Sequence, residues 1–216
     1  MNILSRTRDG RLLTLAINSQ EDGWRYALVD LTTGRIDWIG AEDLTRHSEK
    51  FAETEYHEIP ARDGLRIPIL VTRPNGVTGP GPMVALIHGG PASRDDWHFG
   101  LYTQFLANRG YAVLRVNYRG STGHGRSFQR AGDRQYGRAM QDDIQDAVRW
   151  TVARGIADPD KVAIMGGSFG GYSAMMGLAR DPDTYAAGLS WIGVMDLEHQ
   201  TVNAPHFWGA DKTEWT

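Results

Sequence analysis

Ser168 stands between two pairs of glycines in the stretch Gly166-Gly167-Ser168-Phe169-Gly170-Gly171. A short apolar run, Val162–Met165, precedes this stretch, and a segment of helix-forming residues follows it. A G-x-S-x-G pattern between a strand and a helix is typical of a nucleophile elbow, which holds the serine hydroxyl above a sheet edge. Glycines suit the two flanking positions because side chains there would collide across the tight turn. The pattern favours a nucleophile over the structural alternative, a serine that caps the following helix.

A second glycine-rich stretch, His88-Gly89-Gly90-Pro91, follows the predicted strand Met83–His88. In a hydrolase with a nucleophile elbow, the loop after such a strand and the residue after the nucleophile each lend a backbone N–H to the oxyanion hole. We therefore expect Gly90 and Phe169 to be the oxyanion donors. His88 precedes the nucleophile at a strand end, so a histidine that staples its own loop is favoured over a catalytic base.

Arg119 lies in a third stretch, Tyr118–Gly123, after the predicted strand Ala112–Asn117. Ligands gather at the carboxyl edge of parallel strands. Arg119 either binds a substrate carboxylate or carbonyl there, or braces its own loop. Asp142 and Asp143 open a predicted helix, where we expect them to act as caps. The seven histidines show no helical H-x-x-x-H spacing and cysteine is absent, so we expect neither a metal nor another cofactor.

The partners of the nucleophile are harder to place. In a hydrolase of this type the acid and the histidine follow the nucleophile along the chain, and 48 residues follow Ser168. Asp196 with His199 or His206 gives the required order, but no further parallel strand is predicted that would return either histidine to the serine. We therefore expect the catalytic acid and base to lie beyond the chain end, and the chain alone to be nearly inactive.

Two kinds of element would position these residues. Residues 1–40 contain three β-like runs, Arg11–Ile17, Trp24–Leu31 and Arg35–Ile39, which predict a small antiparallel sheet. Such a sheet is either part of a propeller blade or a β extension packed on the main domain. Residues 41–55 are polar and charged, and are interpreted as a connector.

From residue 56 the pattern of predicted secondary structure changes. A hairpin, Tyr56–Pro60 with Leu65–Thr72, is followed by strands that alternate with helices, which predicts a parallel sheet covered on both faces. The fold class is therefore α/β. The remaining predicted elements are the helices Leu101–Arg109, Asp142–Arg154 and Phe169–Arg180 and the strand Ala187–Trp191.

The composition excludes several classes of partner. A hydrophobic content of 41%, a net charge of −3 and a pI near 6.1 give no reason to expect a nucleic acid or an anionic membrane. The N-terminus does not read as a signal peptide, and no apolar run is long enough to cross a membrane. We expect a cytoplasmic protein, and the sequence carries no feature that fixes its oligomeric state.

Together, these motifs resemble the catalytic domain of the prolyl oligopeptidase family of serine peptidases, nearest its acylaminoacyl-peptidase and dipeptidyl-peptidase-like branch. The resemblance covers about residues 56–200 and rests on four stretches: His88–Pro91, Asn117–Gly123, Gly155–Pro159 and Gly166–Tyr172. It implies an α/β-hydrolase fold, a short peptide as substrate, Ser168 as the acyl-forming nucleophile, and Gly90 and Phe169 as oxyanion donors. Residues 1–40 resemble the end of the β-propeller that precedes this domain in the family.

The sequence also departs from the family pattern. Members carry the triad acid and base in a C-terminal section that is absent here, together with most of the propeller. We therefore expect a partial catalytic domain of residues 56–216, from a truncated reading frame, a partial gene model or half of a split protein. The alternatives are an esterase with the same elbow and a non-catalytic fragment or interaction module.

Overall fold

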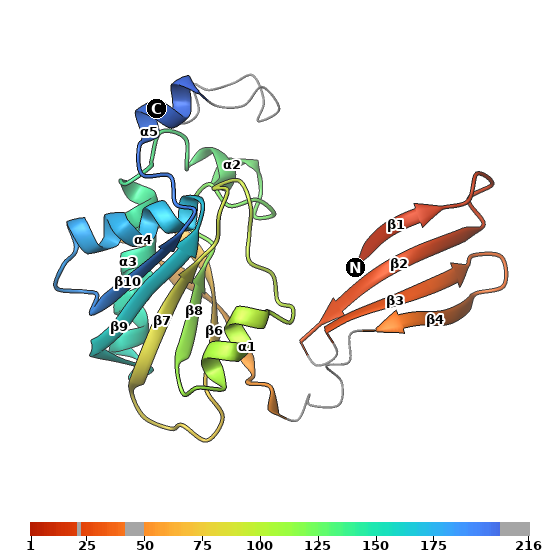
Figure 1. The fold of residues 1–216 in the computed structure, drawn as a ribbon, viewed down its shortest axis with the longest axis horizontal. Helices are drawn as coiled ribbons and strands as arrows, with labels where there is room; N and C mark the ends of the chain where they lie inside the picture. Colours follow the sequence, from red (N-terminus) through yellow and green to blue (C-terminus); the bar gives the residue numbers. More distant parts are fainter. Residues whose placement is uncertain (21–22, 42–49, 204–216) are drawn as a thin grey trace.

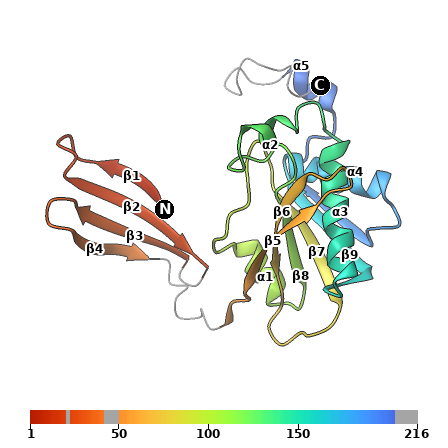
Figure 2. The ribbon, with the colours of Figure 1, turned by 180° about the vertical axis from the view of Figure 1, so that it is seen from behind.

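Two β-sheets stand side by side in the structure, a computed structural model that describes residues 1–20, 23–41 and 50–203. A four-stranded sheet is formed by the N-terminal residues, and a six-stranded sheet with its helices forms the rest (Figure 1). Figure 2 shows the same arrangement from behind.

The N-terminal sheet is antiparallel throughout, with the order β1-β2-β3-β4. Its strands are β1 (Asn2–Arg6), β2 (Leu12–Ser19), β3 (Gly23–Asp30) and β4 (Arg35–Ala41). The last three confirm the three predicted runs, whereas β1 was not predicted because its residues are all exposed and show no alternation. The interpretation of this sheet as a propeller remnant stays a prediction, as do the domain bounds. Residues 42–49 of the predicted connector lie outside the described part of the chain.

The larger sheet is mixed, with the order β10-β9-β7-β8-β6-β5. Its strands are β5 (Thr54–Pro60), β6 (Arg66–Thr72), β7 (Gly81–Ile87), β8 (Ala112–Val116), β9 (Ala157–Gly167) and β10 (Ala187–Trp191). Strands β7 to β10 run parallel to one another, and β6 is antiparallel to both β5 and β8. The carboxyl ends of the parallel strands therefore meet at one edge, where the predicted site residues follow β7, β8 and β9.

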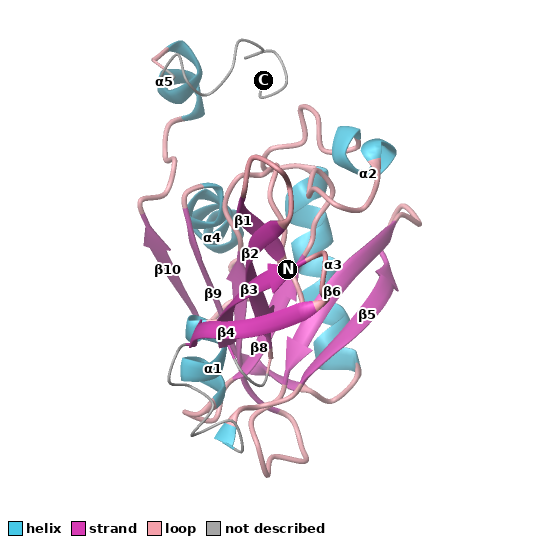
Figure 3. Cartoon of the chain, turned by 90° about the vertical axis from the view of Figure 1, so that its right-hand side faces the viewer, coloured by secondary structure: helices cyan, strands magenta, loops and turns pink. Residues whose placement is uncertain are grey.

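Helices cover both faces of this sheet. Helix α1 (Leu101–Ala107) lies on one face, while α3 (Ala139–Ala153) and α4 (Phe169–Arg180) lie on the other (Figures 1 and 2). Two short helices, α2 (Arg126–Arg130) and α5 (Leu197–Val202), lie beyond the carboxyl ends of the strands (Figure 3). Neither was predicted, because a helix of five or six residues is too short to show a periodic apolar pattern. The arrangement confirms the α/β fold class.

The core lies between the six-stranded sheet and α3 and α4. Apolar residues of adjacent strands meet in register, as Ala85 does with Leu114 on one side and Ile164 on the other, and all three are fully buried. Burial of apolar surface at about 25 cal/mol per Å² makes such layers the main source of stability. Within the described part of the chain, no helix combines the length and the apolar character needed to cross a membrane.

Candidate active site

Ser168 occupies a sharp turn between the end of β9 and the start of α4. Its backbone has φ 55° and ψ −121°, in the region that favours glycine, so this serine is held under local strain of about 1–3 kcal/mol. The turn is fixed on both sides: the Ser168 N–H donates to the Trp191 carbonyl at 3.2 Å, and the Ser168 carbonyl accepts from the Tyr172 N–H at 3.1 Å. The strand, turn and helix predicted around Ser168 are therefore present.

The flanking glycines let the elbow pack against the end of β7. A Cβ atom on Gly166 would lie 2.6 Å from the carbonyl oxygen of Ile87 and 2.5 Å from the carbonyl carbon of Gly170. A Cβ atom on Gly170 would overlap the same Ile87 oxygen. Only glycine fits at these two positions, which is the collision that the sequence pattern predicted.

The loop after β7 passes beside the nucleophile. A Cβ atom on Gly89 would lie 3.3 Å from the Ser168 Cβ and 4.0 Å from its Oγ. Within the described part of the chain, the Gly90 N–H has no hydrogen-bond acceptor. Phe169 is the first residue of α4, so its N–H has no acceptor within the helix. The loop after β7 and the residue after the serine thus offer two backbone donors that have no acceptor among the described residues, although their role as an oxyanion hole stays a prediction.

His88 joins the loops that follow β7 and β8. Its Nδ1 lies 2.7 Å from the Gly89 carbonyl oxygen and its Nε2 lies 3.0 Å from Ser121 Oγ. The ring stacks on Tyr118 at a centroid distance of 4.5 Å, and the Tyr118 hydroxyl donates to the His88 carbonyl at 3.0 Å. Because a carbonyl only accepts, we assign the proton to Nδ1. Burial lowers the pKa of His88. These contacts match the predicted loop-stapling histidine.

Arg119 is buried and forms hydrogen bonds with two carboxylates of the protein, those of Asp143 and Asp63. Its N–H and Nε donate to Asp143 Oδ2 at 2.9 and 2.8 Å, and its Nη2 donates to Asp143 Oδ1 at 2.7 Å. Its Nη1 and Nη2 donate to the two oxygens of Asp63 at 2.7 and 3.1 Å. These hydrogen bonds raise the pKa of Arg119 and support the loop-bracing alternative, while a substrate-binding role for Arg119 stays a prediction.

The interpretation of Asp142 and Asp143 as helix caps was wrong. Helix α3 begins at Ala139, almost one turn before Asp142, so neither residue occupies the cap position. Asp142 instead accepts from Arg62 at 2.9 Å and from Arg180 at 2.6 Å. Asp143 is fully buried, and its burial raises its pKa while the hydrogen bonds from Arg119 oppose that rise.

The internal candidates for acid and base do not meet the serine. Asp196 caps α5 by accepting from the His199 N–H at 2.8 Å, and the His199 ring lies 3.3 Å from Asn203 Nδ2. His206 lies outside the described residues. Within the described part of the chain, the Ser168 hydroxyl makes no hydrogen bond, and no imidazole is bonded to it.

A pocket of about 180 Å³ adjoins the predicted oxyanion loop. The loops after β7 and β8 and the segment between α2 and α3 line it. Tyr136 forms one wall of the pocket and packs edge-on against Phe169, the residue that follows the nucleophile, at a centroid distance of 4.9 Å. Sequence reasoning missed Tyr136, because no motif connects it to the elbow.

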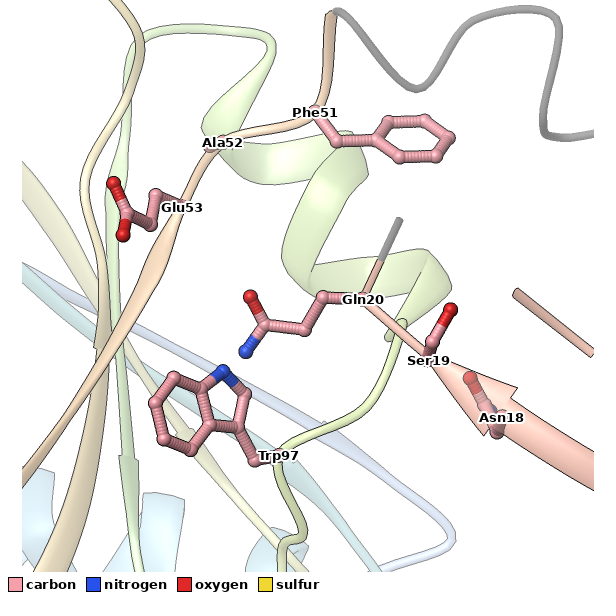
Figure 4. A pocket seen from close by; sticks show the side chains of 7 residues that line it. All are labelled: Asn18, Ser19, Gln20, Phe51, Ala52, Glu53 and Trp97. Carbon is pink, nitrogen blue, oxygen red and sulfur yellow. The ribbon is translucent and has the colours of Figure 1, made fainter. Parts of the chain in front are cut away.

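A larger pocket of about 740 Å³ lies where the N-terminal sheet meets the main domain. Figure 4 shows its seven lining residues, with the Gln20 side chain extending from the end of β2 toward the indole of Trp97. Phe99 links the two parts nearby, since its N–H donates to the Ser19 carbonyl at 3.2 Å. None of the lining residues is a predicted site residue, so this pocket is separate from the elbow.

Comparisons with known proteins agree with this geometry. The sequence pattern of the prolyl oligopeptidase family matches residues 97–216. Dipeptidyl aminopeptidase BIII of Pseudoxanthomonas mexicana is 35% identical over 97% of this chain, which covers 32% of that protein. Dipeptidyl peptidase family member 6 of Caenorhabditis elegans is 44% identical over 60% of this chain and 17% of its own length. The chain therefore spans a third or less of these relatives.

Solved structures show the same fold. A puromycin-hydrolyzing peptidase of Mycobacterium tuberculosis superposes with a TM-score of 0.83 and 28% identity, over 92% of this chain and 31% of that one. An acylaminoacyl peptidase of Pyrococcus horikoshii superposes with a TM-score of 0.80 over 99% of this chain and 33% of that one, and its 21% identity supports the fold alone. The family match covers more than half of the chain and coincides with the elbow and the sheet edge described above. The chain belongs to the prolyl oligopeptidase family.

Proposed function

We propose that this chain provides the nucleophile and the oxyanion hole of a serine peptidase that cleaves short peptides through an acyl-serine intermediate. One observation carries the proposal: Ser168 is held at φ 55° beside Gly89, and the N–H groups of Gly90 and Phe169 have no acceptor among the described residues. Family membership and the names of the relatives, which are peptidases, support the same conclusion.

The proposed reaction uses these groups in sequence. The Ser168 oxygen attacks the carbonyl carbon of the scissile amide and loses its proton to a base, while the carbonyl oxygen becomes an oxyanion. The N–H groups of Gly90 and Phe169 stabilise that oxyanion, and each such donor accounts for about 3 kcal/mol of barrier. The amine then leaves with a proton from the base, and water hydrolyses the acyl-serine ester to restore the hydroxyl.

The proposal also concerns where the general base lies. The described histidines make other contacts, as His88 does with Ser121 and His199 with Asn203. We propose that the histidine and its acid lie outside the described residues, and we propose separately that the chain by itself turns over amides negligibly. Without a triad, only a modest rate gain from the oxyanion hole and from binding is left. The cytoplasmic location predicted from the sequence stays a prediction.

Hydrolysis of aminoacyl p-nitroanilides and of matched p-nitrophenyl esters by the purified chain tests these statements. We expect no amide turnover above that of the Ser168→Ala variant, and slow acylation by the esters that requires Ser168. Amide turnover that Ser168→Ala abolishes would show that the base lies within residues 1–216. Ester acylation that persists unchanged in Ser168→Ala would contradict the assigned nucleophile. A longer protein with a complete triad that hydrolyses the esters but not the amides would favour the alternative function, an esterase.

A further inference from the structure

The loop that carries Gly90 has no secondary structure of its own. Residues 88–100 connect β7 to α1 without a helix or a strand, so contacts with other segments must fix the position of the Gly90 N–H. Two of these contacts come from the segment after β8: the Tyr118 hydroxyl donates to the His88 carbonyl at 3.0 Å, and the Thr122 N–H donates to the Ser93 carbonyl at 2.8 Å.

Asn117 supplies a more specific contact to the same loop. It directly follows β8, is 2% exposed, and directs its side-chain amide at the backbone of Asp95. Asn117 Oδ1 accepts from the Asp95 N–H at 2.8 Å, and Asn117 Nδ2 donates to the Asp95 carbonyl at 3.0 Å. One side chain thus satisfies both backbone groups of Asp95, as a neighbouring strand would.

The chemistry of this contact requires an amide. It needs one acceptor and one donor about 2 Å apart on a short, rigid side chain, which asparagine provides. Aspartate has the same shape but no donor, so one carboxylate oxygen would face the Asp95 carbonyl oxygen. The Asp95 carboxylate adds a second negative charge, and the nearby Arg115 reaches it only at 3.7 Å. An Asn117→Asp substitution therefore breaks one hydrogen bond and places like charges together.

We propose that Asn117 is a positioning residue that clamps the 88–100 loop at Asp95 and so aims the Gly90 N–H at the developing oxyanion. The clamp rests on the two hydrogen bonds between Asn117 and Asp95, whereas its catalytic consequence rests on the proposed function. Asn117 touches neither the nucleophile nor the oxyanion, and acts through the loop.

Amide hydrogen exchange of the 216-residue chain tests the clamp without needing activity. In Asn117→Asp we expect the hydrogen-bonded amides of Ser93 and Asp95 to exchange about tenfold faster, because the loss of one hydrogen bond loosens the loop. Asn75→Asp is the matched control, since Asn75 is exposed and donates to the Lys50 and Phe51 carbonyls, both at 3.3 Å. The same exchange in folded Asn117→Asp as in the wild type would overturn the clamp.

If Asn117→Asp does not fold, the wild type alone decides the question. The two Asn117 Nδ2 protons are then expected to exchange slowly and to show NMR cross-peaks to Asp95. Rapid exchange of these protons without such cross-peaks would overturn the clamp.

Saturation kinetics with an alkyl fluorophosphonate test the positioning role. We expect Asn117→Asp to lower the maximal rate of Ser168 labelling, kinact, about tenfold while KI is unchanged, because the defect concerns the oxyanion and not ground-state binding. Unchanged kinact would overturn the positioning role. A wild-type chain that is not labelled at Ser168 would contradict the proposed function instead, and the exchange experiment would still decide the clamp.

Discussion

Gly170 packs so closely against Ile87 that any side chain on Gly170 would overlap the Ile87 carbonyl oxygen. This contact joins the first turn of α4 to the last residue of β7, and therefore joins the nucleophile elbow to the loop that carries Gly90. The glycines of the G-x-S-x-G pattern serve the assembly of the site as well as the tight turn itself.

A Gly170→Ala substitution is expected to destabilise the protein by about 3 kcal/mol, because backbone atoms of β7 must move to admit the new methyl group. Urea denaturation measures this change. Gly79→Ala is the control, since a Cβ atom on Gly79 would meet nothing within 4 Å, and we expect its effect to stay within about 0.5 kcal/mol. Equal stability of the two variants would contradict the close contact.

An Arg119→Lys substitution separates the two interpretations of Arg119. Lysine keeps the charge but loses the planar fork that binds Asp143 and Asp63, so we expect a loss of about 3 kcal/mol in unfolding free energy. Arg109→Lys is the control, because Arg109 is exposed and its side chain contacts Phe105 in the described part of the chain. Unchanged stability of Arg119→Lys together with lost peptide binding would favour a substrate-binding role.

The buried His88 is expected to make stability depend on pH. Burial lowers the pKa of His88 in the folded state, so below the unfolded pKa of about 6.5 the unfolded chain binds a proton that the folded chain does not. His88 therefore contributes stability that is present above about pH 6.5 and is lost as the pH falls, at up to about 1.4 kcal/mol per pH unit. Urea midpoints at pH 7, 6 and 5 should fall less steeply in His88→Gln. Parallel pH profiles for the two proteins would contradict this.

Local patterns predicted the parts of the site that lie within one short segment. The elbow at Ser168 and the glycines at 89 and 90 were predicted because their spacing encodes backbone geometry directly. The start of α3 was misplaced, since Arg138 at its N-cap makes no side-chain cap bond and gives no recognisable signal.

Local sequence patterns could not predict contacts between residues that lie far apart in the sequence. Asn117 and Asp95 are 22 positions apart, and Arg119 and Asp63 are 56 positions apart. Nothing in the sequence around either residue indicates its partner. The pairs form because the sheet order places β8 between β7, whose following loop carries Asp95, and β6, whose preceding turn carries Asp63. The loop-bracing role of Arg119 was an open alternative for this reason.

The central claim is that the hydroxyl of Ser168 is the reactive nucleophile of this chain. Treatment with an alkyl fluorophosphonate, followed by intact mass measurement and peptide mapping, tests it most directly. We predict a single adduct that maps to Ser168 and is absent from Ser168→Ala. An adduct that persists in Ser168→Ala, or that is spread over the other serines, would contradict the account.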